Sequence, residues 1–148
     1  MNPKLSESRV RKYFDMAESA AHYSDNKRTR LGAVLVYKNK VLSVGWNLED
    51  KTNPLQKQLN SLRGFSPDES GCKNTIHAET SCLLKIKDLD IDWSKANLFV
   101  SRILKDDTKA MARPCPACMA YARSLGIKNY YYTTGKDMWA YERCDGND

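Results

Sequence analysis

The sequence predicts an α/β fold, a three-layer α/β/α sandwich around a mixed sheet of about five strands. Two observations support this. The chain has 148 residues, of which 41% are apolar and 28% are charged, and this suits a single globular domain covering residues 1–148. Periodic patterns follow one another in the order helix, hairpin, helix, strand, helix, strand. Helices and strands that alternate in this way pack as layers, with helices on both faces of the sheet.

The first expected elements are a helix and a hairpin. Apolar residues recur at helical spacing over residues 6–22, and Ser6 or Ser8 can cap the start of this helix. Two β-rich runs follow, at 31–37 and 41–47, around a short polar turn that contains an Asn. Because Asn tolerates positive φ, this turn favours an antiparallel hairpin.

The middle of the chain begins with a long polar stretch, residues 48–74, in which a helical piece is expected around 55–62. Connections of this length are usually functional loops or partly disordered. The later elements are a helix at 75–87, a strand at 97–103, a helix at 116–125 that stops at Gly126, and a strand at 127–133. About 14 residues follow Thr134, which is too few for a parallel crossover and a further strand. The tail is therefore predicted to turn and form an antiparallel last strand.

Two short segments carry side chains suited to metal chemistry. The first is His77-Ala78-Glu79, and the second contains Cys115 and Cys118, three residues apart. One imidazole and two thiolates are typical zinc ligands, and three protein ligands leave the fourth position open, as in catalytic zinc sites. The cysteines bracket the start of an expected helix, where the positive end of the helix dipole favours thiolates. The nearby carboxylate can move a proton at bound water.

With its H-x-E and P-C-x-x-C segments, the chain resembles the cytidine/deoxycytidylate deaminase superfamily. The resemblance covers roughly residues 29–134. It implies the deaminase-like fold and a Zn²⁺ cofactor held by His77, Cys115 and Cys118. It also implies that Glu79 is the catalytic proton carrier during hydrolytic release of ammonia, and that the protein is a homo-oligomer. An antiparallel last strand is similar to the branch that contains the free-nucleoside cytidine deaminases.

The resemblance also indicates candidate substrate contacts. Asn47 ends the second hairpin strand and matches an Asn that contacts the substrate sugar in the family, although a strand-terminal turn is the ordinary role of such a residue. Ala33 resembles the small residue that lines the base pocket, and packing within the strand explains it equally well. Ala78, between the expected ligand and the expected acid, is counted among the substrate-binding residues.

One segment departs from the family pattern. Typical members pass from the third strand into the Pro-Cys pair within a few residues, but here residues 103–113 intervene, with a polar turn at Asp106 and Asp107. This segment must emerge beside the zinc. Arg102 and Arg113 flank it, and two interpretations stand level: contact with a substrate phosphate, or ion pairs with Asp106 or Asp107. On the first interpretation Arg102 is a candidate substrate-binding residue.

The remaining cysteines offer an alternative to a catalytic centre. A fourth ligand from Cys72, Cys82 or Cys144 would close the metal site and make it structural, but such a site would have no use for Glu79. With five cysteines, two of them in a metal-type pair, and no need for disulfide bridges, a reducing, cytoplasmic location is expected.

The aromatic residues suggest a base-stacking surface. Residues 130–132 are three consecutive tyrosines in an expected strand, so Tyr131 should point opposite to its neighbours, and all three are best explained as core and sheet surface. Trp46, beside Asn47, and Trp139, near the terminus, are the better candidates for a wall against the base.

Three functions are compatible with these sequence features. The first is zinc-dependent hydrolytic deamination of a cytosine nucleoside or nucleotide, such as cytidine or dCMP, to the uracil form. The second is the same chemistry on cytosine or adenine in single-stranded DNA or RNA, and the third is a non-catalytic zinc module that binds nucleic acid. The net charge of +6 permits phosphate contacts without selecting among these functions, because the basic residues are spread along the chain. No apolar stretch is long enough to make a membrane a partner.

Overall fold

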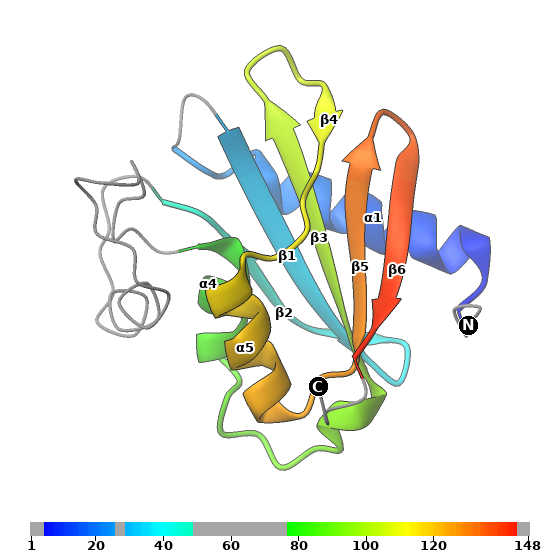
Figure 1. Ribbon diagram of the computed structural model, residues 1–148, viewed down its shortest axis with the longest axis vertical. Helices are drawn as coiled ribbons and strands as arrows, with labels where there is room; N and C mark the ends of the chain where they lie inside the picture. Colours follow the sequence, from blue (N-terminus) through cyan, green and yellow to red (C-terminus); the bar gives the residue numbers. More distant parts are fainter. Residues whose placement is uncertain (1–4, 26–28, 49–76, 145–148) are drawn as a thin grey trace.

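The structure is a computed structural model, and it describes residues 5–25, 29–48 and 77–144. Almost all of the expected 48–74 loop, with its helical piece, lies outside the described residues, as does Cys72. The described part is an α/β fold with a mixed sheet and helices on both of its faces, which confirms the predicted fold class (Figure 1). No helix within it is long and apolar enough to cross a membrane.

The first helix, α1, spans Glu7–Ala21. Ser6 caps it, since its side-chain oxygen accepts a hydrogen bond from the backbone N–H of Arg9 at 3.3 Å. Its apolar stripe packs on one face of the sheet, as the helical spacing predicts. The buried residues of the helix are Val10, Tyr13, Phe14, Ala17, Ala20 and Ala21.

Strands β1 (Thr29–Tyr37) and β2 (Lys40–Trp46) form the predicted antiparallel hairpin. Tyr37 pairs with Lys40, so the turn has two central residues, Lys38 and Asn39. Both have positive φ, 50° and 63°. Two successive residues with positive φ match the right-handed twist of the strands. Of the two, only Asn39 is of a residue type that tolerates this conformation well.

The second half of the described chain supplies two helices, a 3₁₀ turn and three further long strands. Their bounds are α4 Ala78–Leu84, the turn Trp93–Lys95, β3 Ala96–Leu104, α5 Pro116–Leu125, β5 Asn129–Gly135 and β6 Met138–Arg143. Helix α5 has the predicted bounds, and Gly126 ends it with a φ of 106°. Helix α4 ends three residues before the predicted limit of Lys87.

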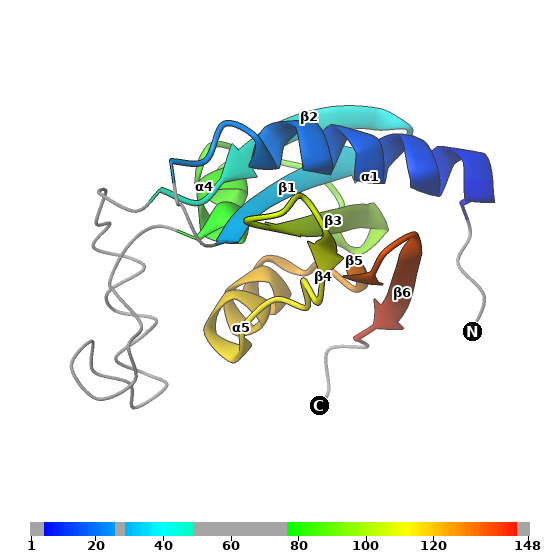
Figure 2. The ribbon, with the colours of Figure 1, turned by 90° about the horizontal axis from the view of Figure 1, so that it is seen from above.

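The sheet order is β2-β1-β3-β5-β6. Strands β3 and β5 are parallel and are connected through α5, whereas every other neighbouring pair along this order is antiparallel. Strand β6 returns beside β5, with Tyr141 opposite Tyr131, and confirms the antiparallel last strand. Seen from above, α1 covers one face of the sheet, while α4 and α5 lie on the other (Figure 2).

The segment that departs from the family pattern forms a second hairpin. Strand β3 continues to Leu104, and the short strand β4 (Lys109–Ala110) returns antiparallel to its end. Strand β4 lies against both β3 and β5, because the Thr133 hydroxyl donates to the carbonyl of Ala110 at 2.7 Å and accepts from the N–H of Arg102 at 3.3 Å. The backbone N–H of Ala112 then donates to the carbonyl of Thr133 at 2.8 Å. The insertion is thus built into the sheet at the edge from which the chain leaves for α5.

Candidate metal centre

The two motif segments meet because each opens a helix on the same face of the sheet. His77 is the N-cap residue of α4, Cys115 is the N-cap of α5, and Cys118 is the third residue of α5. Helices α4 and α5 contribute to one core cluster against that face (Figure 1). The starts of the helices therefore lie side by side, although 38 residues separate His77 from Cys115.

The geometry of the three side chains fits zinc. The Nδ1 atom of His77 lies 3.6 Å from Sγ of Cys115 and 3.3 Å from Sγ of Cys118. All three candidate ligand atoms lie within 4.8 Å of one another. Bond lengths of about 2.0 Å to nitrogen and 2.3 Å to sulfur around a tetrahedral Zn²⁺ require N···S separations of about 3.5 Å. Among the described residues this is the one group of three or more such side chains that can hold a metal.

The local electrostatics favour thiolate at the first cysteine. The hydrogen bond with Cys118, together with the nearby His77, lowers the pKa of Cys115 to about 4 against the opposing effect of burial. The backbone N–H of Cys118 donates to Sγ of Cys115 at 3.5 Å, as an N-cap side chain requires. Cys118 is the more buried thiol, and its pKa is raised by its hydrogen bond with Cys115 and by burial.

Glu79 lies in the first turn of α4, two residues after His77, and only 4% of its surface is exposed. Burial raises the pKa of its carboxyl, while the charge of His77 and a hydrogen bond with Cys118 lower it. An acid group is therefore buried beside the ligand cluster. The structure brings the four motif side chains together; their catalytic and ligand roles stay predictions.

Helix α4 sits close to the sheet because of Gly45 on β2. A Cβ atom at this position would lie 2.4 Å from the backbone nitrogen of Cys82 and 2.6 Å from the carbonyl oxygen of Ala78, so no larger residue fits. Ser43, two residues earlier on the same face, donates its hydroxyl to the carbonyl of Cys82 at 2.7 Å. Ala33 and Ala78, both candidate substrate contacts, are fully buried in this packing.

Asn47 follows β2 and is 8% exposed. Its side-chain oxygen accepts from the N–H of Leu31 at 2.8 Å, and its Nδ2 donates to the carbonyl of Thr29 at 3.1 Å. The side chain thus prolongs the β2–β1 pairing beyond the last residue of β2 and fixes the rim of the sheet. Its predicted contact with substrate stays a prediction.

The two arginines that flank the insertion have protein partners other than Asp106 and Asp107. Arg102 donates from Nε to the hydroxyl of Thr29 at 2.7 Å and from Nη1 to the carbonyl of Met111 at 3.4 Å. Strand alternation puts Arg102 on the same face of the sheet as α4 and α5, which is compatible with a contact to substrate. That contact stays a prediction. Arg113 pairs with Glu142.

The alternative that Arg102 and Arg113 pair with Asp106 or Asp107 is wrong. Asp107 binds Arg30, at 2.5 Å, and Asp106 accepts from the backbone N–H of Thr108 at 3.1 Å. Asp106 is therefore bound within the β3–β4 hairpin, as local turn geometry favours, and Asp107 is bound to a residue of β1.

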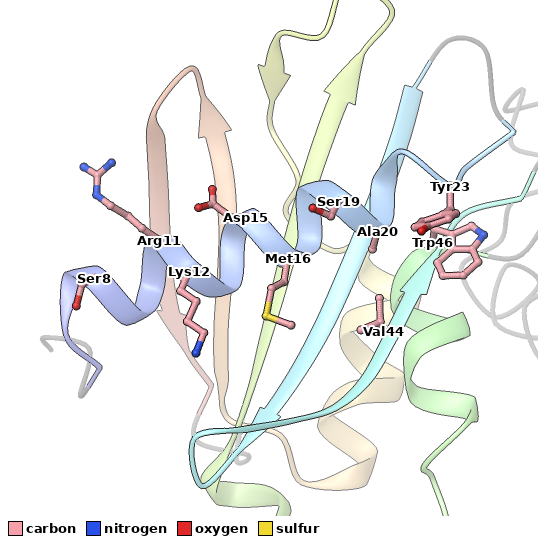
Figure 3. A pocket seen from close by; sticks show the side chains of 10 residues that line it. All are labelled: Ser8, Arg11, Lys12, Asp15, Met16, Ser19, Ala20, Tyr23, Val44 and Trp46. Atoms are coloured by element: carbon pink, nitrogen blue, oxygen red, sulfur yellow. The ribbon is translucent and has the colours of Figure 1, made fainter.

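The proposed tryptophan wall is also wrong. Because Gly45 faces α4, its neighbour Trp46 faces the other side of the sheet, where it lies against Tyr23 with ring centroids 5.1 Å apart. Trp46 lines a groove of about 660 Å³ between α1 and β2 (Figure 3). Trp139 packs on the same side, with its ring centroid 6.0 Å from that of Phe14. Trp139 is separated from the ligand cluster by the sheet. Trp46, on the edge strand β2, lies between Tyr23 and Lys85, whose Nζ is 5.2 Å from the ring centroid. Lys85 is the C-cap of α4, so Trp46 is at the end of this helix opposite to His77.

The other cysteines lie outside the cluster. Cys82 is a fully buried residue of α4, and burial raises the pKa of its thiol to about 12. Cys144 contacts Glu142, with Sγ 3.8 Å from Oε2. Neither belongs to the ligand group, so within the described residues the alternative of a structural site has lost two of its three proposed fourth ligands.

Sequence reasoning missed one residue close to the cluster. Thr80 is fully buried, and its hydroxyl oxygen lies 3.6 Å from Sγ of Cys118. A detectable signal exists, because residues three apart share a helix face and Thr80 follows His77 by three. The Thr29 and Thr133 contacts had no comparable signal, since their partners are distant in sequence.

Comparisons with known proteins agree with this geometry. A profile of the cytidine and deoxycytidylate deaminase zinc-binding region matches residues 7–134. An uncharacterized deaminase in the luxG 3′ region of Aliivibrio fischeri is 25% identical over 127 residues, which cover 82% of this chain and 70% of that protein.

Two solved structures share the fold. The dCMP deaminase of the cyanophage S-TIM5, in apo form, has a TM-score of 0.61 at 24% identity, covering 88% of this chain and 86% of that one. The cytidine deaminase of Burkholderia pseudomallei has a TM-score of 0.59 at 15% identity, covering 94% and 93% of the two chains.

Proposed function

The chain belongs to the cytidine and deoxycytidylate deaminase family, and on that premise we propose that it is a zinc-dependent hydrolytic deaminase of a cytosine nucleoside or nucleotide. The product is the corresponding uracil compound, and ammonia is released. The observation that carries the proposal is the convergence of His77, Cys115 and Cys118 on one point, with the buried carboxylate of Glu79 in the same cluster.

Each side chain has a distinct part in the reaction. His77, Cys115 and Cys118 hold zinc, which when bound supplies a Lewis acid that activates water for attack on the amine-bearing ring carbon. Glu79 takes a proton from that water, gives it to the ring nitrogen, and then assists departure of the amine. Burial of Glu79 suits both steps, because a raised pKa brings a carboxyl closer to neutral pH and lets it act as acid and base.

The substrate contacts are proposed from the family match. Asn47 binds the sugar, Ala33 and Ala78 border the base, and Arg102 is available to a 5′ substituent at the site end of β3. The S-TIM5 dCMP deaminase has also been solved in complex with dCMP and dUMP, which supports a free nucleotide as substrate. We extend the proposal to a single-domain, homo-oligomeric, cytoplasmic enzyme with a small-molecule substrate.

The two other functions receive less support. A polynucleotide substrate would need a phosphate track, for which the sequence offers Lys27, Arg28, Arg30, Arg63 and the tyrosines; Lys27, Arg28 and Arg63 lie outside the described residues. Arg30 instead binds Asp107, and residues 130–132 are all buried. A non-catalytic zinc module leaves the buried carboxylate of Glu79 without a purpose, and burying a charged group costs stability.

A substrate panel tests the proposal. Zinc-loaded protein is incubated with cytidine, deoxycytidine, dCMP, and an oligonucleotide with a single cytosine, and ammonia release is measured. We expect turnover of at least one free nucleoside or nucleotide, and loss of that turnover together with a lower melting temperature after dialysis against a strong chelator. Activity confined to the oligonucleotide would reject the proposed substrate class. Full activity in the metal-free protein would reject zinc dependence.

A further inference from the structure

We infer that the ion pair between Arg113 and Glu142 positions the ligand Cys115, so that the last strand of the sheet is part of the metal centre. The inference rests on the metal site of the proposed function. It concerns two side chains outside the group of ligand residues, which would act through Cys115 and are therefore positioning residues. The metal affinity that tests it can be measured without any turnover.

The contact between the two side chains is well formed. Arg113 donates from Nε to Oε1 of Glu142 and from Nη2 to Oε2, both at 2.9 Å. Such a forked pair fixes direction as well as distance, because both groups are planar. The hydroxyl of Tyr132, on β5, donates to the same Oε1 at 3.2 Å. Glu142 thus ties β6, β5 and the segment that leads into α5.

The backbone carries this constraint to the metal ligand. Arg113 is followed by Pro114, which is buried, and then by Cys115. Proline fixes its own φ and restricts the residue before it to extended conformations. The backbone between Arg113 and Cys115 therefore has less freedom than an ordinary pair of peptide units. A shift of Arg113 is transmitted to Cys115 and is not absorbed between them.

The three ligands differ in how they are held. Cys118 lies within α5, and Thr80 contacts its sulfur. His77 is next to the first turn of α4, which Gly45 seats against β2. Cys115 is the N-cap of α5, where its sulfur accepts from the N–H of Cys118, and it is also the last residue of an irregular segment that begins after β4. Its position therefore depends on that segment as well as on the helix. The insertion lengthens the connection from β3 to α5. An anchor just before Cys115 therefore fixes the end of this longer connection.

The segment between β4 and Cys115 has two further attachments. The N–H of Ala112 donates to the carbonyl of Thr133, and the carbonyl of Met111 accepts from Arg102. Both lie farther from Cys115 than Arg113 does. The Arg113 fork is the attachment nearest to the ligand that reaches across to β6. Its loss leaves Cys115 held by Pro114, by α5 and by the two more distant attachments at Met111 and Ala112.

Zinc affinity tests the inference directly. We compare the wild type with Glu142→Gln, Arg113→Gln and the double variant, using competition with a chromophoric chelator at a temperature where every metal-free protein is folded. Each single variant should bind zinc about tenfold more weakly, the lower end of the effect of residues that orient metal ligands. The double variant should be no weaker than either single one, because the two side chains act as a pair. In the cobalt-substituted proteins, the thiolate-to-metal absorption should change in all three variants.

A matched control and a milder variant sharpen the result. Glu7→Gln removes the acid of another Arg–Glu pair, Arg11–Glu7, which lies exposed on α1, and it should leave zinc affinity and the cobalt spectrum unchanged. Arg113→Lys keeps the charge but loses the fork, so an intermediate loss is expected, and this variant serves if Glu142→Gln does not fold.

Unchanged zinc affinity and cobalt spectrum in the folded variants, even with a lower melting temperature, would overturn the inference and leave the ion pair a purely structural contact. An equal loss in Glu7→Gln would overturn it as well. Wild-type protein that binds zinc tightly but deaminates nothing would reject the proposed function and leave this inference intact.

Discussion

The two faces of the sheet are built from the same strands but from different chemistry. On the α1 face the core is aromatic: the rings of Phe99 and Tyr131 stack with centroids 4.4 Å apart, and Phe14 meets Phe99 edge-on at 5.3 Å. On the face of α4 and α5, small residues such as Ala33 and Ala78 lie beside buried polar groups. Neighbouring residues of one strand can therefore serve opposite purposes, since alternation separates them by the thickness of the sheet.

The difference shows where stability and function are expected to reside. Burying ionisable groups is unfavourable, and the metal side buries Glu79 together with the Cys118 thiol. The core cluster on the α1 side contains no carboxyl or thiol, and its large rings pack against one another, which contributes strongly to stability. The metal side buries rings as well, those of Tyr130 and Tyr132, but it combines them with the ionisable groups. We expect the aromatic packing on the α1 face to offset the folding free energy lost by burying ionisable groups on the face of α4 and α5, the metal side. Substitutions of the buried ionisable groups on the metal side should then lower activity without lowering stability, and substitutions on the aromatic side should lower stability without changing the metal site.

The largest expected effect is on turnover. Glu79→Gln keeps the size of the side chain but removes its ability to carry a proton, so kcat should fall by about 10²- to 10⁴-fold. Zinc content should be unchanged, because Glu79 is not among the ligand atoms. The free energy of unfolding should not fall, since an amide avoids the cost of a buried charge. Steady-state assays, metal analysis and urea unfolding measure these three quantities.

The control lies on the opposite face. Glu18→Gln removes an acid of α1 that pairs with Lys109 at 3.6 Å, and it should leave kcat unchanged. A Glu79→Gln protein that keeps wild-type turnover would break the comparison, because the buried carboxylate would then serve packing alone.

The next effect is on stability. Phe99→Ala removes a fully buried ring at the centre of the aromatic cluster and should lower the free energy of unfolding by about 3–5 kcal/mol. Zinc affinity of the folded variant should stay at the wild-type value, because the side chain points away from the ligands. Urea unfolding and chelator competition check both statements. A loss of zinc affinity by itself, without loss of stability, would show that the faces are not independent.

The sequence could predict what depends on neighbours in the chain. The bounds of α5 follow from an early proline and a terminal Gly126, and the convergence of the motif residues follows from two helix starts on one side of a sheet. The face of Trp46 was misjudged because strand alternation alone does not tell which parity faces α4. Gly45 decides this, through a close contact that is visible only in three dimensions.

Contacts between distant segments were beyond the sequence. Arg113 had two nearby acids as candidates, yet its partner is Glu142, 29 residues later. Asp106 accepts a hydrogen bond within its own turn, and Asp107 pairs with Arg30 on β1. Glu142 is within reach of Arg113 only because β6 lies beside β5. Likewise, the strand within the insertion depends on Thr133, whose hydroxyl substitutes for ladder hydrogen bonds where β3 and β5 separate.

The smallest expected effect concerns the pH dependence of stability on the metal side. The hydrogen bonds from Arg113 lower the pKa of Glu142 below its ordinary value of 4.5. A carboxyl with a depressed pKa in the folded state stabilises the fold above its ordinary, unfolded pKa, and this contribution is lost as the pH falls through the lower folded value. Because the pair is partly exposed, it should contribute only about 0.5–1 kcal/mol.

Urea unfolding of metal-free wild type and Glu142→Gln at pH 6 and at pH 3 measures this contribution, and metal removal keeps zinc release at low pH out of the comparison. The wild type should be the more stable at pH 6, and its advantage should shrink at pH 3 as Glu142 becomes protonated. In an Arg113→Gln background the same substitution should have little effect at either pH, because the cation that lowers the pKa is gone. An advantage that is equal at both pH values would mean that Glu142 acts on the metal side through packing and not through its charge.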